Sequence, residues 1–65
     1  MKAIPIDVYD SEGNLTKIEF VDAEGVHIID AQWDENDEQT SENRVNFREW
    51  AYRHLSENMK YEVDR

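Results

Sequence analysis

Residues 4–21 read IPIDVYDSEGNLTKIEFV, and this stretch predicts a β-hairpin. Apolar and polar residues alternate on both sides of a short polar segment, and a period of two is typical of half-buried strands. The polar segment carries turn residues, because Asp10 can bond to nearby backbone and Gly13 can adopt a positive φ. Pro5 has no N–H to donate, so it is expected at a sheet edge or at the start of its strand.

Residues 9–16, YDSEGNLT, resemble the hairpin turn of the YD-repeat family. The resemblance covers these eight residues once, without the repeat that defines the family. It implies turn chemistry, and no function follows from it.

Two further segments complete the expected fold. Residues 26–33 follow a turn at 22–25 and are rich in β-branched residues, which predicts a third strand. Residues 42–58 have helical periodicity, and Thr40 or Ser41 can cap this helix. The expected fold class is α+β, a three-stranded antiparallel β-meander with one C-terminal helix packed on it. The chain is expected to form one small domain, with 1–33 as the sheet, 34–41 as an acidic loop that is solvated and mobile, 42–58 as the helix, and 59–65 as a tail or short last strand.

The same periodicities predict the core. The expected core residues of the helix are Phe47, Trp50, Ala51 and Leu55. Those of the sheet are Ile4, Ile6, Val8, Ile18, Phe20, Val26 and Ile28, with Ile29 and Trp33 on the opposite face. The apolar arc of the helix is wider than one contact with a sheet requires. We therefore predict an apolar interface, used in homodimerisation, that consists of Val45, Tyr52 and Met59.

Charge is distributed unevenly along the chain. Sixteen acidic residues against seven basic ones leave a net charge of −9. Residues 1–42 hold twelve acidic residues and two lysines, a net charge of −10, whereas residues 43–65 carry +1. A field of one sign attracts partners of the opposite sign and repels nucleic acid and anionic membranes. Direct binding of nucleic acid or of a membrane is therefore not expected.

The acidic residues of the strands suggest how such a partner could be bound. Alternate residues of a strand lie about 6.8 Å apart, close to the roughly 7 Å between phosphates along one nucleic-acid strand. Asp7, Glu19 and Asp30 can therefore imitate a row of phosphates, although the same charge could simply maintain solubility. The predicted partner-binding acidic face consists of Asp7, Asp10, Glu12, Glu19, Asp22, Glu24, Asp30, Asp34, Glu35, Asp37 and Glu38.

The sequence contains no signature of catalysis or of metal binding. There is no cysteine, and His27 and His54 lack the spacing of a zinc site, so packed and hydrogen-bonded histidines are expected. Residues 34–38 begin like a calcium loop, but Gln39 and Val45 stand where that loop needs Gly and Glu. We therefore expect no enzymatic activity, no cofactor and no metal.

Together these features predict a small acidic inhibitor or decoy. Its expected partner is a basic protein surface, that of a nucleic-acid-binding host protein, blocked through nucleic-acid mimicry by surface carboxylates. Phages and other mobile elements encode proteins of this kind for host takeover. The alternative is a homodimeric structural or regulatory module without enzymatic activity. The chain has no long apolar run and no signal-peptide pattern at its start, which predicts a cytoplasmic location.

Overall fold

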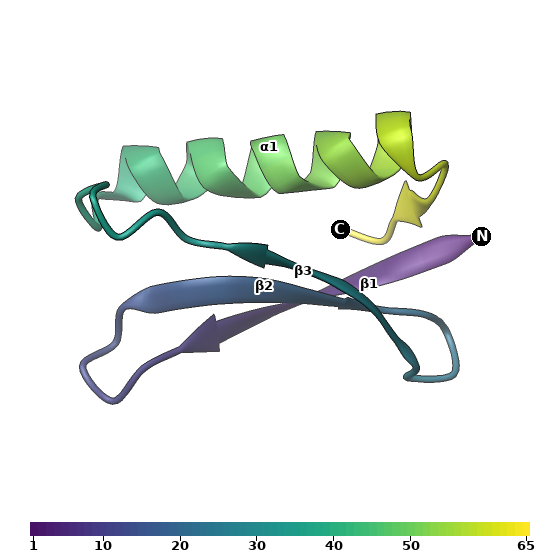
Figure 1. Cartoon of the computed structure of the whole chain (residues 1–65), viewed down its shortest axis with the longest axis horizontal. Helices are drawn as coiled ribbons and strands as arrows, with labels where there is room; N and C mark the ends of the chain where they lie inside the picture. Colours follow the sequence, from purple (N-terminus) through teal and green to yellow (C-terminus); the bar gives the residue numbers. More distant parts are fainter.

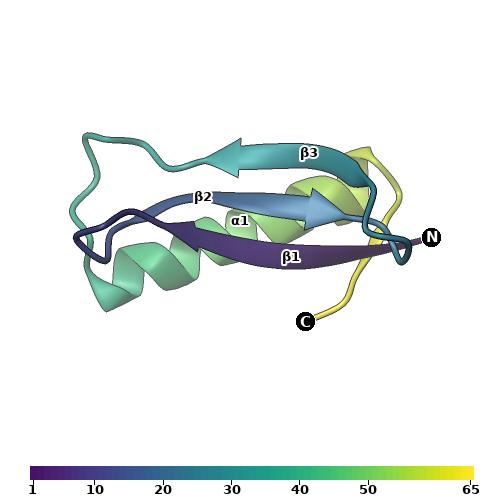
Figure 2. The same ribbon diagram turned by 90° about the horizontal axis from the view of Figure 1, so that it is seen from below.

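A computed structural model describes all residues 1–65 and confirms the α+β fold. The elements are β1 (Lys2–Tyr9), β2 (Leu15–Val21), β3 (His27–Gln32), α1 (Ser41–Asn58) and β4 (Glu62–Val63). The strand order is β3-β2-β1-β4, in which β1, β2 and β3 form the predicted antiparallel meander and β4 runs parallel to β1. The helix covers one face of the sheet (Figure 1), and Figure 2 shows that no segment crosses the other face. We call the second face the uncovered face.

The end of the chain forms the short last strand that the sequence left open. After α1, Lys60 has a φ of 60°, in the left-handed region, and the N–H of Tyr61 donates to the carbonyl of Leu55 at 3.2 Å. This sharp turn brings β4 beside the start of β1, where the N–H of Asp64 donates to the carbonyl of Ala3 at 2.8 Å. The outer edge of β1 beyond this point has no partner strand. Pro5 lies on this edge, as its missing N–H predicts.

The core lies between α1 and the sheet. Its fully buried side chains are Ala3, Leu15, Ile18, Phe20, Ala51 and Leu55. Phe20 meets the ring of Tyr52 edge-on at a centroid separation of 6.1 Å. The structure thus confirms Ile18, Phe20, Ala51 and Leu55 as buried core residues. Ile28 and Phe47, which were also predicted, are partly buried and pack against this core.

The prediction of which β1 residues face the helix is wrong. Ala3 is buried beneath the helix, and Asp7 forms an ion pair with Arg48 of α1. Because side chains alternate between the faces of a strand, the apolar residues of opposite parity lie on the uncovered face. These residues are Ile4, Ile6 and Val8, of which Ile6 is 43% exposed.

A β-bulge overturns part of the prediction for β3, although Ile28 does pack against the core as expected. The register with β2 shifts between Phe20 and Val21, so Ile28 is an extra residue that interrupts the alternation of faces. As a result, Ile29 and Trp33 face the helix rather than the opposite side.

Two other predicted core residues are exposed. Val26 lies in the β2–β3 turn and is 57% exposed. Its carbonyl accepts from the N–H of Asp22, and its own N–H donates to Oδ1 of Asp22. Trp50 lies on α1 and is 53% exposed. Both residues therefore belong to the surface.

Candidate protein-binding surface

One end of the molecule gathers the β1–β2 turn, the loop between β3 and α1, and the first turn of α1 (Figures 1 and 2). We call it the acidic end, and its carboxylates belong to Asp10, Glu12, Asp34, Glu35, Asp37, Glu38 and Glu42. None of these seven residues forms an ion pair. Residues of both loops, among them Asp10 and Glu35, line a common hollow of about 390 Å³. The acidic end therefore brings together seven carboxylates without ion pairs, and Arg44 is the single basic residue among these segments.

Two of these carboxylates hold the turns that carry them. Oδ1 of Asp10 accepts hydrogen bonds from the backbone N–H groups of Asn14 and Glu12, both at 2.9 Å. The bond from Asn14 is the main cause of the lowered pKa of Asp10. Oδ1 of Asp34 accepts from the N–H of Asn36 at 3.0 Å. These Asx turns explain why aspartate stands at both positions, while the other five acidic-end side chains remain free for a partner.

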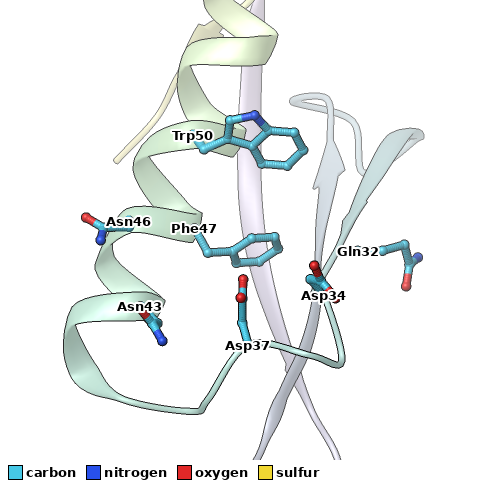
Figure 3. Close-up of a pocket in the computed structure, with 7 residues that line it drawn as sticks. All are labelled: Gln32, Asp34, Asp37, Asn43, Asn46, Phe47 and Trp50. Carbon is cyan, nitrogen blue, oxygen red and sulfur yellow. The ribbon is translucent and has the colours of Figure 1, made fainter.

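Beside the acidic end, four rings form what we call the aromatic ladder: Trp33, Phe47, Trp50 and His54. Trp33 meets Phe47 edge-on at 5.1 Å, and Trp50 stacks on Phe47 at 6.1 Å and on His54 at 6.0 Å. Phe47 and Trp50 project from α1 toward the acidic loop (Figure 3). The spacing of Phe47, Trp50 and His54 on α1 suggested a core stripe. Phe47 does pack against the core, whereas Trp50 and His54 are exposed.

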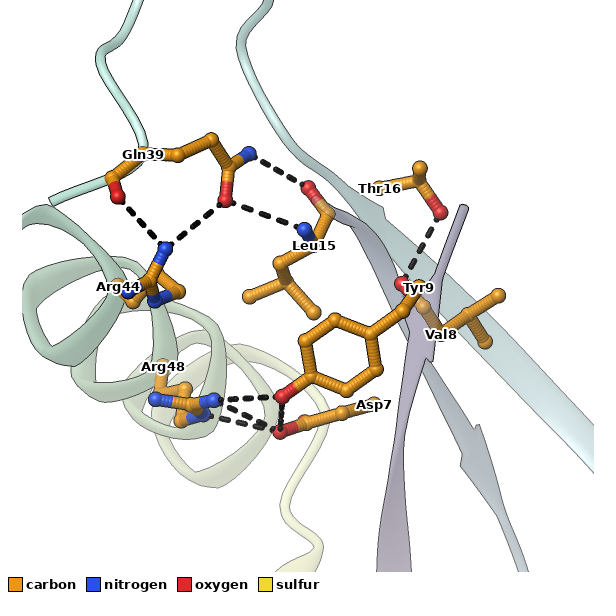
Figure 4. Close-up of polar contacts among 8 residues, drawn as sticks. All are labelled: Asp7, Val8, Tyr9, Leu15, Thr16, Gln39, Arg44 and Arg48. Atoms are coloured by element: carbon orange, nitrogen blue, oxygen red, sulfur yellow. Dashed lines mark hydrogen bonds and ion pairs between the residues drawn. The ribbon is translucent and has the colours of Figure 1, made fainter. Parts of the chain in front are cut away.

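The acidic loop is anchored to the sheet by Gln39 (Figure 4). Its side-chain amide accepts from the N–H of Leu15 at 3.1 Å and donates to the carbonyl of Leu15 at 2.9 Å. Arg44 donates to the main-chain carbonyl of Gln39 at 2.6 Å, and Nε1 of Trp33 donates to the carbonyl of Asp37 at 3.2 Å. The sequence predicted a solvated loop, and composition could not reveal these polar anchors.

The predicted row of carboxylates along the strands does not exist. Asp7 faces α1, where Arg48 donates to its Oδ2 from Nε at 3.0 Å and from Nη2 at 2.9 Å (Figure 4). Glu19 and Asp30 lie opposite each other in the register of β2 and β3. Nζ of Lys17 lies 3.2 Å from the carboxylate of Glu19 and 3.6 Å from that of Asp30. The three residues therefore lie on two faces, and each has a cation beside it.

The remaining members of the predicted acidic face lie at the opposite end of the sheet. Asp22 and Glu24 belong to the β2–β3 turn (Figure 1), and Oδ1 of Asp22 accepts from the N–H of Glu24 and of Val26, both at 2.9 Å. The predicted acidic face is thus divided into the acidic end, the neutralised strand residues and this distant turn.

The predicted apolar interface on α1 is not a surface patch. Tyr52 and Met59 pack against the core, and the guanidinium of Arg65 lies 4.9 Å from the centroid of the Tyr52 ring. Burial raises the pKa of Tyr52. Of the three predicted interface residues, Val45 alone is exposed. Most of the wide apolar arc of the helix therefore packs against the core.

Both histidines are hydrogen-bonded, as expected, but they are exposed rather than packed in the interior. Nε2 of His27 lies 2.9 Å from Oδ1 of Asp30, and this bond lowers the pKa of Asp30. Nδ1 of His54 lies 3.0 Å from the side-chain amide of Asn58. No group of three or more His, Asp or Glu side chains is arranged to hold a metal ion.

Comparison with protein-family models, curated proteins and solved structures gives no match for this chain. Its single helix is not at once long and apolar enough to cross a bilayer.

Proposed function

We propose that this protein binds a basic surface of a partner protein with its acidic end and blocks that surface. The observation that carries the proposal is the group of seven carboxylates without ion pairs, brought together from loops that β2 and β3 separate along the chain. Gln39 and Trp33 hold the acidic loop in place. Less conformational entropy is then lost when a partner binds.

A nucleic-acid-binding protein is the partner that this charge fits best. Surfaces that bind phosphates are rich in lysine and arginine, and a compact group of carboxylates competes for them. The chain itself offers no comparable basic surface. Of its seven basic residues, Lys17, Arg48 and Arg65 are paired with carboxylates, and the other four are spread over β1, α1 and the segment after α1. The protein then acts as an inhibitor or decoy, through the charge of its loops rather than through a row of carboxylates along its strands.

Capture of the partner from a lysate tests the proposal. Wild-type protein is expected to retain a basic, nucleic-acid-binding protein at low salt, identified by mass spectrometry. The triple variant Glu12→Gln, Glu35→Gln, Glu38→Gln is expected to lose it, because three free charges disappear from the acidic end. These side chains form no ion pair within the chain, so circular dichroism should be unchanged. With the purified partner, DNA or RNA should displace the wild-type protein.

The matched control changes the net charge equally at other sites. Glu24→Gln, Glu57→Gln, Glu62→Gln removes three exposed carboxylates that lie outside the acidic end. This variant should retain the partner. Equal loss in both triple variants would mean that net charge alone is responsible, and a partner that nucleic acid cannot displace would contradict the decoy function.

The uncovered face supports a second candidate function, a homodimeric module. Apolar side chains on this face belong to Ile4, Ile6, Val8 and Val21. Face-to-face packing of two sheets would bury them, since β-sandwiches bury such faces in this way. If this is correct, sedimentation equilibrium should show a dimer at high micromolar concentration, and Ile6→Lys should shift it to monomer. A wild-type monomer at that concentration would exclude this candidate.

A further inference from the structure

A groove of about 420 Å³ lies between the first half of α1 and the acidic loop (Figure 3). Phe47 and Trp50 of the aromatic ladder line one wall, and Asp34 and Asp37 of the acidic end line the other. Figure 3 shows both rings and both carboxylates projecting into the space between α1 and the end of β3. Aromatic rings and carboxylates therefore share one concave surface.

The aromatic wall is held in place and yet open to solvent. Trp50 stacks on Phe47 and on His54, which restricts its ring, while more than half of its surface is exposed. The other tryptophan is fixed by a hydrogen bond from its Nε1 to the loop, whereas Trp50 has no such bond. A restricted and exposed indole offers a large contact area at low cost in conformational entropy, which is typical of the residues that dominate interfaces.

The acidic wall determines the charge of the occupant. The carboxylate of Asp37 forms no ion pair, and Asp34 uses only Oδ1, for the N–H of Asn36. No lysine, arginine or histidine lines the groove. The groove therefore repels phosphates and complements a positively charged group.

We propose that the groove receives an arginine side chain of the basic partner, with its guanidinium against Trp50 and within hydrogen-bonding reach of Asp34 and Asp37. A guanidinium is planar, stacks on aromatic faces and presents five donors in a fork that matches carboxylates. A lysine ammonium is more strongly hydrated and cannot stack in this way. This inference rests on the proposed function and narrows it from attraction between charges to recognition of one side chain.

Peptide titration tests the groove directly. The probe is acetyl-Gly-Arg-Gly-Arg-Gly-amide, and the reference is the same peptide with lysine in place of arginine. In ¹⁵N-labelled protein at low salt, the indole N–H of Trp50 reports on the groove, and that of Trp33 reports on the loop through its bond to Asp37. We expect the Trp50 indole to shift most. The arginine peptide should bind at least about threefold more tightly than the lysine peptide.

Two variants separate the groove from general charge attraction. Trp50→Leu removes the ring at an exposed position, and should weaken binding of the arginine peptide about two- to fivefold and remove its advantage over lysine. Asp37→Asn removes one charge inside the groove. Its matched control, Glu12→Gln, removes one charge from the β1–β2 turn, outside the groove. We expect Asp37→Asn to weaken binding several-fold more than Glu12→Gln.

Equal effects of Asp37→Asn and Glu12→Gln, or an arginine preference that survives in Trp50→Leu, would overturn the proposed arginine site. Failure of the wild-type protein to bind either peptide would also overturn it. Each of these outcomes leaves the proposed function standing if the acidic end still captures a basic partner. A different result would contradict the proposed function: capture of the partner that is the same with and without the acidic-end carboxylates.

Discussion

Replacing Phe20 with alanine is expected to unfold most of the protein at room temperature. Phe20 is fully buried and contributes the largest side chain of the core, in edge-on contact with Tyr52. Removing a buried phenylalanine side chain costs about 3–5 kcal/mol. A core in a domain of this size supplies about the same net stability, 3–5 kcal/mol. Far-UV circular dichroism and urea titration should therefore show a largely unfolded chain without a cooperative transition.

Ile6→Ala is the control for this substitution. Ile6 has a similarly apolar side chain, but it lies half-exposed on the uncovered face. Its truncation should cost about 1 kcal/mol or less and leave a cooperative transition. If Ile6→Ala destabilised the protein as much as Phe20→Ala, the uncovered face would have to be buried in solution, which would favour the homodimeric module.

Lowering the salt concentration is expected to accelerate binding to the proposed partner by at least about tenfold. The Debye length grows from about 10 Å at 0.1 M salt to about 30 Å at 0.01 M. The field of the acidic end then reaches an approaching basic surface from further away. Because such steering acts on the encounter, the association rate should change far more than the dissociation rate. Stopped-flow fluorescence, with the exposed Trp50 as reporter, measures both rates.

The triple variants provide the comparison for this experiment as well. Glu12→Gln, Glu35→Gln, Glu38→Gln should associate more slowly and with a shallower dependence on salt. The variant with substitutions at Glu24, Glu57 and Glu62 should keep most of the wild-type dependence. An association rate that does not respond to salt would contradict binding through the acidic end.

The secondary structure was predictable because its causes are local. Asp10 and Gly13 form the expected hairpin turn, and Gly13 has a φ of 83°. Thr40 caps the helix by accepting a hydrogen bond from the N–H of Asn43 at 3.1 Å. Each of these features depends on residues close in the chain, so residue type and spacing were enough to predict the meander and the helix.

The prediction of which strand residues face the helix failed at two places, a bulge in β3 and an ion pair between β1 and α1. The bulge at Ile28 reverses the faces that strict alternation predicts for Ile29 and Trp33. On β1, Asp7 was expected to face solvent, but it lies under the helix because Arg48, far away in sequence, provides its counter-charge. Neither a bulge nor a distant ion pair leaves a periodic signal in the sequence.

The candidate binding surface was also predictable only in part from the sequence. Composition alone established the strong negative charge of residues 1–42, because charge is a sum over residues and needs no coordinates. Which carboxylates stay free and share one end was decided by tertiary contacts, above all by Gln39 holding the acidic loop against Leu15. The exposure of Trp50 beside that loop depends on how α1 packs across the sheet. This surface depends on contacts between segments that are distant in the chain, and the periodicity of residue types along the sequence carries no information about such contacts.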